Sequence, residues 1–112
     1  MVTTEKNIKL TRGDSYGFNF LIEDTEDQAV ELDACFFSVK ENPDDDDYIF
    51  QKDLSRGIQR LSDGQYYVKV NPADTENLQQ RCYYYDLECT IGENVFTFLK
   101  GKLDIKWDVT KE

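Results

Sequence analysis

The chain has 112 residues, and its 23 acidic and 13 basic side chains give a formal net charge of −10 with no histidine. This charge repels the phosphates of nucleic acids and anionic lipid headgroups, so neither nucleic acid nor membrane is expected as a partner. Without histidine, nucleophiles activated by a histidine base and most transition-metal sites are excluded. No apolar run approaches the length of a membrane-spanning helix, and the N-terminus carries no export signal, so we expect synthesis in the cytoplasm.

Alternating apolar residues predict three strands in the first half of the chain, over 7–10, 15–22 and 34–41. The first turn contains Arg12-Gly13-Asp14, which spells the integrin-binding tripeptide. Three residues are a weak signal, and we interpret them as a turn in which glycine supplies the backbone freedom. The second turn, at 24–28, is polar.

An acidic run, Asp44 to Asp47, follows Asn42-Pro43. We interpret it as a solvated loop, because the glycine and glutamate positions of an EF-hand calcium loop are not matched. A weak surface ion site there is left open. A short strand with poor alternation, 48–52, is expected at a sheet edge, and a hairpin is predicted over 58–70.

One short helical turn is predicted near 72–78, with Asn71 as N-cap, Pro72 at the first helical position and Leu78 packed down as a plug. The stretch 81–103 then reads as a long hairpin with its turn at 92–94.

The phase of this hairpin follows from its period of two. Odd positions from Tyr83 to Ile91 face the core. In the second strand Val95, Thr97 and Leu99 alternate with Phe96 and Phe98 on the opposite side. Gly101 is expected to mark a bulge, after which three residues complete the buried row: Leu103, Ile105 and Trp107.

Together these elements predict an all-β fold, an immunoglobulin-like antiparallel β-sandwich of seven or eight strands formed by one domain over 1–112. An open barrel is the alternative. The expected core includes inward residues of four strands: Phe18, Phe20, Phe37, Val68, Tyr85 and Leu87. Cys35 and Cys89 lie on inward rows, so buried thiols are expected, and a disulfide between them is geometrically conceivable.

Four aromatic positions are predicted on rows opposite the core: Tyr84, Phe36, Tyr67, and either Phe96 or Val95. On adjacent strands of one sheet they would form a patch typical of a protein interface, with a more extensively folded-over core as the alternative. The carboxylates cluster in turns where water surrounds them, so a catalytic acid and base pair is remote. We therefore predict a protein that is not an enzyme and has no catalytic, cofactor or metal site.

Three stretches carry a resemblance to a known family: IKLTRGDSYGFNF, VELDACFFSVKENPDDDDYIFQKD and GQYYVKVNPADTENLQQRCYYYDLECTIGENVFTFLKGKLDIKWDVT. The chain resembles small phage tail and baseplate modules with an immunoglobulin-like fold, related to the N-terminal domain of the siphophage baseplate upper protein. It departs from them at Gln79-Gln80-Arg81, where the family often has Pro-Pro-Gly.

The resemblance implies a non-enzymatic structural protein of a phage or prophage tail, made in the bacterial host cytoplasm and located in the virion. Its implied partners are other tail or baseplate proteins, or further copies of itself as a homo-oligomer. The family brings no catalytic residues. A hypothesis of another class is a carbohydrate- or peptide-binding sandwich module of a bacterial surface protein.

Overall fold

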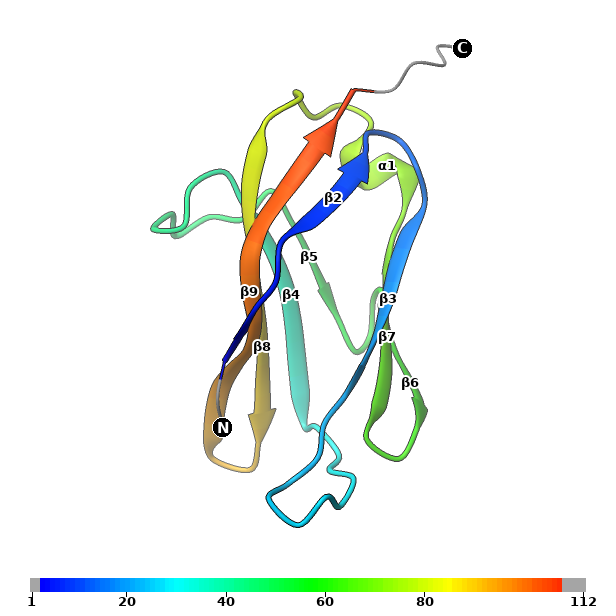
Figure 1. Ribbon diagram of the computed structural model, residues 1–112, viewed down its shortest axis with the longest axis vertical. Helices are drawn as coiled ribbons and strands as arrows, with labels where there is room; N and C mark the ends of the chain where they lie inside the picture. The colour runs from blue at the N-terminus through cyan, green and yellow to red at the C-terminus, as the bar shows by residue number, and fades with distance from the viewer. Residues whose placement is uncertain (1–2, 108–112) are drawn as a thin grey trace.

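A computed structural model describes residues 3–107, which form two packed β-sheets and one helical turn (Figure 1). The larger sheet has the order β1 (Thr4–Glu5), β9 (Asn94–Lys106), β8 (Cys82–Ile91), β4 (Ala34–Lys40) and β5 (Phe50–Asp53), with β2 (Ile8–Thr11) also paired to β9. The smaller sheet has the order β3 (Tyr16–Leu21), β7 (Gln65–Val70) and β6 (Ile58–Ser62). The predicted immunoglobulin-like β-sandwich is confirmed. Residues 1–2 and 108–112, including the Asp-Val-Thr that ends the third stretch of the family resemblance, lie outside the described residues.

The strand pairings are antiparallel except at the N-terminus. There β1 and β2 run parallel to β9, with Thr4 opposite Leu99 and Ile8 opposite Leu103. The two-residue β1 is an addition to the predicted strands. The prediction of antiparallel pairing throughout is therefore wrong for these two strands. Both run alongside β9 and in the same direction, which a local sequence pattern does not reveal.

The core lies between the sheets and matches the predicted inward rows. Phe37 and Leu87 are fully buried, and the Phe37 ring lies 5.4 Å from the Tyr85 ring and 5.7 Å from that of Phe18, centroid to centroid. Phe18 is only partly buried, because β3 is an edge strand. The other predicted core residues, Phe20, Val68 and Tyr85, are buried.

Buried tyrosines anchor segments of main chain that lie between strands. Tyr83 donates its hydroxyl to the carbonyl of Gln79 at 3.0 Å, an arrangement known as the tyrosine corner of immunoglobulin-like folds. Tyr85 donates to the carbonyl of Lys6 at 2.6 Å. Burial raises the pKa of Tyr85 to about 12, so this hydroxyl stays protonated and remains a donor.

The bulge in β9 does not lie at Gly101. The register shifts where Leu87 faces Leu99 and Glu88 faces Thr97, which leaves Phe98 as the extra residue. Gly101 pairs in register with Tyr85, and a side chain there would collide with the backbone of Lys6. The glycine is required for close approach of the β1–β2 segment, not for a bulge.

This shift changes which side chains of β9 face the core. Phe96 faces inward opposite Cys89 and packs against the core, whereas Val95 is 61% exposed. Leu103 and Ile105 are buried as predicted, but Trp107 is 50% exposed and lies under the guanidinium of Arg12, 4.7 Å from the ring centroid.

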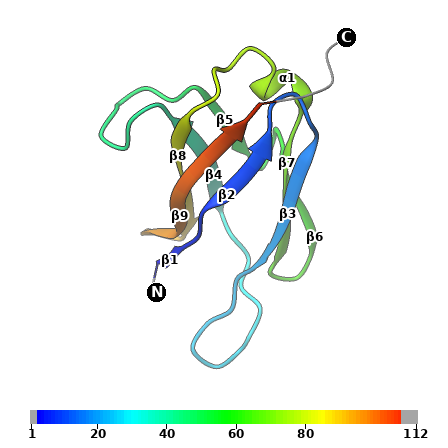
Figure 2. The same ribbon diagram turned by 45° about the horizontal axis from the view of Figure 1, so that its top comes forward.

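The predicted helical turn is α1 (Pro72–Thr75), at the end of the sandwich beside the β2–β3 turn (Figure 2). Asp74 accepts a hydrogen bond from the backbone of the N-cap, Asn71, at 2.7 Å. Leu78 is partly buried and packs against the core as predicted, whereas Thr75 is fully buried and its hydroxyl accepts a hydrogen bond from the backbone of Gly13 at 2.9 Å. Gly13 has a φ of 80°, so the Arg-Gly-Asp segment is a structural turn.

Replacing Tyr85 tests the phase of β8. Tyr85→Ala should lower the free energy of unfolding by about 3 kcal/mol or more, because it opens a cavity beside Phe37. Tyr85→Phe should lose only about 1 kcal/mol, since it removes one hydrogen bond and keeps the packing. Urea denaturation measures both, and a loss below about 0.5 kcal/mol for the alanine variant, typical of a surface site, would show that this face is not the core.

Candidate functional site

The outward rows of β4, β8 and β9 form a surface that combines an aromatic side chain with charged ones. Tyr84 has Lys40 of β4 as its register partner on one side and Lys102 of β9 on the other. In the next row Asp86 lies opposite Lys100. A hollow of about 560 Å³ opens over these rows. We call this surface the outer face of the larger sheet.

The centre of the outer face is partly dehydrated. Burial raises the pKa of Asp86 above its ordinary value, and the charge of Lys40 partly opposes this. Beside Asp86, Ser38 is buried and accepts a hydrogen bond from the side-chain amide of Gln51 at 2.9 Å. Keeping this carboxylate charged is costly in the free protein, and a partner that offers it a hydrogen-bond donor lowers this cost.

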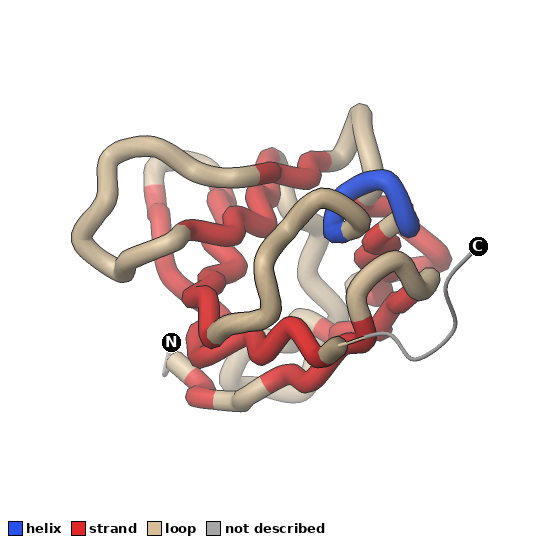
Figure 3. The backbone as a smooth tube through the Cα atoms, turned by 90° about the horizontal axis from the view of Figure 1, so that it is seen from above, coloured by secondary structure: helices blue, strands red, loops and turns tan. Residues whose placement is uncertain are grey.

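Charge is distributed unevenly over the outer face. The β9 side carries Lys100 and Lys102, and Glu5 forms an ion pair with Lys100 at 3.7 Å. A second hollow, of about 310 Å³, extends the face toward β5 and is lined by Asp46 and Glu88. The loop over 41–49 projects away from the sandwich on this side (Figure 3).

The four predicted interface residues do not form one patch. Tyr84 and Phe36 both lie on the outer face, two rows apart, since Tyr84 pairs with Lys40 and Phe36 with Glu88. Phe96 faces the core and is withdrawn from the site, and Val95 is the exposed member of that pair.

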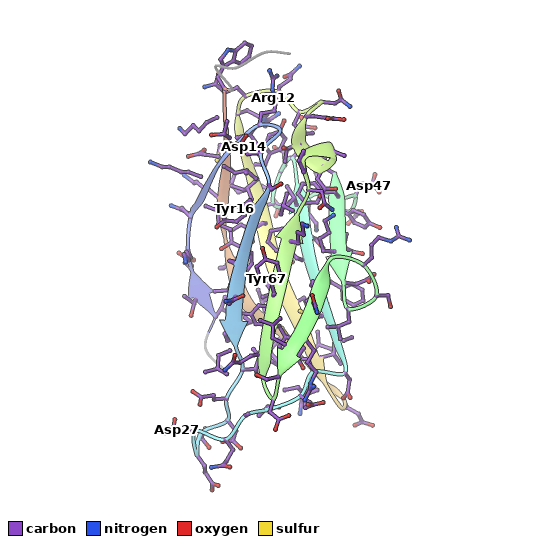
Figure 4. All side chains as sticks on the ribbon, turned by 90° about the vertical axis from the view of Figure 1, so that its right-hand side faces the viewer. Arg12, Asp14, Tyr16, Asp27, Asp47 and Tyr67 are labelled. Atoms are coloured by element: carbon purple, nitrogen blue, oxygen red, sulfur yellow. The ribbon has the colours of Figure 1, made fainter. Side chains whose placement is uncertain are left out.

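Tyr67 lies on the other sheet, where Figure 4 shows it on β7. Its ring lies over Gly17 of β3, so closely that a side chain at Gly17 would collide with it. The tyrosine therefore covers a glycine in the neighbouring strand. Its placement serves packing within the smaller sheet and not a contact surface shared with Tyr84.

The lysines and the aspartate of the outer face were missed in the sequence. The alternation that turns Tyr84 outward also turns Asp86 outward, and this signal was available. No such signal was available for Lys100 and Lys102, because the side of the sheet that they face depends on where the β9 bulge lies. Without the register, these lysines could not be placed beside Tyr84.

Other candidate sites have structural explanations. Within residues 3–107 no group of three or more acidic or cysteine side chains is placed to hold a metal ion, so the weak ion site at Asp44 to Asp47 gains no support. Cys35 and Cys89 are register partners with free thiols, and their sulfurs lie 3.7 Å apart. Their mutual hydrogen bond and burial raise the pKa of Cys35, which keeps it a thiol.

No protein-family model matches the chain, and no curated protein is significantly similar to it. In the described part of the chain, no helix is both long and apolar enough to span a membrane.

Removing the charge of Asp86 should stabilise the protein in a pH-dependent way. The folded pKa lies above the unfolded one, so between the two values the native state holds the extra proton and stability falls as pH rises. At neutral pH both states are ionised and the full penalty is present. Asp86→Asn should therefore unfold at higher urea than the parent at pH 7, with the advantage disappearing as pH falls below the ordinary aspartate pKa of about 3.9. A stability advantage of Asp86→Asn that stays constant across this pH range would contradict the raised pKa of Asp86. The control is Glu88→Asn on the same strand.

Proposed function

We propose that this protein is a non-enzymatic structural module of a phage or prophage tail or baseplate that assembles through the outer face of its larger sheet. The observation that carries the proposal is Tyr84, set in a hollow between Lys40 and Lys102 on a chain of net charge −10. The sequence resemblance to baseplate modules and the immunoglobulin-like sandwich support the same role.

The chemistry of the outer face favours a protein partner. A tyrosine combines a large apolar ring with a polar end, and such residues commonly dominate the binding energy of interfaces. The flanking lysines offer charge to carboxylates, while Asp46 and Glu88 across the face require basic groups opposite them. A partner must therefore match both charges, which gives specificity and fixes its orientation.

A second copy of the chain satisfies this requirement. A two-fold axis parallel to β4 and β8 would set the β9 lysines of one copy over the β5 side of the other, where Asp46 lies in the loop before β5. Tyr84 would then lie over Lys40 of the second copy, a pairing of ring and cation. Self-association is thus the simplest version of the proposal, and a neighbouring tail protein with the same division of charge is the other.

The test compares two lysine substitutions. Tyr84→Lys places a charge at the centre of the outer face, and Leu61→Lys places the same charge at an exposed position, 48% accessible, on the other sheet. Sedimentation velocity in moderate salt measures self-association, and a pull-down uses the proteins encoded by neighbouring genes. Tyr84→Lys should weaken the association at least tenfold, equivalent to about 1.4 kcal/mol, and Leu61→Lys should leave it unchanged.

Three outcomes would leave the proposal without support. In the first, the parent protein is a monomer that captures none of the proteins encoded by neighbouring genes. In the second, Tyr84→Lys leaves the association unchanged. In the third, Tyr84→Lys and Leu61→Lys weaken the association equally. A genomic position away from tail, capsid and terminase genes would contradict the phage assignment by itself.

A further inference from the structure

The edge strands of the two sheets are protected to very different degrees. Native proteins guard edges with charges, bulges or short strands, because free backbone groups recruit foreign strands. In β5 the inward Lys52 is buried and forms an ion pair with Asp74 at 2.7 Å. In β6 the register shifts after Arg60, which forms ion pairs with Glu31 and Asp63.

Strand β3 has none of these devices. Its sequence, YGFNFL, contains no charge and no proline, and its six residues pair with β7 without a break in register. Within residues 3–107, β7 is the only strand paired with it. The free edge of β3 borders an opening between β3 and β9. On the β9 side of this opening, β1 and β2 cover β9 only from Leu99 onward.

The register shows which backbone groups of β3 face this opening. Ile22 donates its N–H to Gly64 at 2.9 Å, directly after the pair Leu21 and Gln65. Bonded and non-bonded pairs alternate in an antiparallel ladder, so the even positions of β3 bond to β7. The N–H and C=O groups of the odd positions, Gly17, Asn19 and Leu21, therefore point away from β7.

An apolar cleft of about 220 Å³ lies beside these free groups. Phe18 and Phe20 line it from β3, and Phe98 and Leu99 line it from β9. The rings of Phe20 and Phe98 lie 5.8 Å apart, centroid to centroid. An added strand would thus find hydrogen-bonding groups at its backbone and an apolar recess for its alternate side chains.

We propose that β3 is a strand-addition site that accepts an extended segment of a partner protein. The backbone of the segment pairs with Gly17, Asn19 and Leu21, and its apolar side chains, at every second position, fill the cleft. This site is separate from the outer face of the larger sheet, and its existence does not depend on the function proposed above.

Charge specifies the segment further. The loop that follows β3 carries Glu23, Asp24, Glu26 and Asp27, all exposed. Figure 4 shows Tyr16 at the start of β3 and Asp27 in the loop beyond its other end. The fitting occupant is therefore apolar at alternate positions and basic at the end that lies against this loop.

Amide hydrogen exchange followed by NMR tests the proposal directly on the whole chain. The probes are two eight-residue peptides in which threonine and valine alternate. One carries two lysines at its N-terminus and the other carries two at its C-terminus. Both are needed because parallel and antiparallel addition bring opposite ends of the peptide to the acidic loop. In the free protein the amides of Asn19 and Leu21 should exchange quickly and those of Phe18 and Phe20 slowly. One saturating peptide should slow the exchange of Asn19 and Leu21 at least tenfold.

Two variants of Asn19 isolate the backbone contribution. Asn19→Pro removes the outward N–H while keeping the bonds to β7, and it should abolish peptide protection. Asn19→Ala removes the same side chain, keeps the N–H, and should bind as the parent does. Slow exchange at Phe18 and Phe20 reports that either variant is folded, and the measurement on the parent protein stands without them.

Several results would overturn the proposal. The proposal fails if neither peptide, at millimolar concentration, protects the amides of the odd positions of β3. It also fails if the peptides protect amides of β6 instead, or if a folded Asn19→Pro variant binds the peptide as well as Asn19→Ala does. Protection that appears without peptide and grows with protein concentration would assign the edge to a second copy instead of a partner segment. The peptide results leave the Tyr84→Lys experiment untouched, and self-association through β3 would differ from the outer-face association because Tyr84→Lys would not weaken it, so the two proposals fail separately.

Discussion

A buried tyrosine hydroxyl must find a hydrogen-bond partner, and this requirement holds the ends of the sandwich in place. Tyr83 and Tyr85, two residues apart on β8, reach the carbonyls of Gln79 and Lys6. Tyr66 of the smaller sheet accepts a hydrogen bond from the backbone of Leu32 at 2.8 Å. Each ring fills the core while its hydroxyl binds main chain that enters or leaves a strand. Three segments between strands are thereby tied to the two sheets by side chains from the core itself.

The two sides of the sandwich differ because of how its edges are closed. On the β5 side Lys52 turns inward, and its ammonium meets Asp74 at the base of α1. An inward charge on an edge strand would be costly without this partner, so the ion pair both closes the sandwich and blunts the edge. On the β3 side the aromatic residues of two strands meet at an unsealed cleft. The asymmetry leaves one edge suited to contact.

The strongly acidic composition conceals a local arrangement of charge. Nine of the 23 carboxylates stand in the two loops at 23–27 and 41–47, whereas three lysines lie on the outward rows beside Tyr84. Net charge opposes indiscriminate association, and the division of charge on the outer face permits association with a partner in one orientation. A protein that works through ordered contacts in an assembly needs both properties, which is why this surface is the contact surface in the proposed function.

Local alternation determined much of the fold from sequence. The inward rows of β4 and β8, the turn at Gly92 and the helical turn after Asn71 all follow from period two and from turn chemistry, which involve only neighbours in the chain. The tertiary structure decided what depends on distant residues. The bulge at Phe98 turned Phe96 inward, and the sheet that each strand joined separated Tyr67 from Tyr84. Register and sheet membership arise from pairing between strands far apart in sequence, and a one-residue shift in register reverses every side chain beyond it.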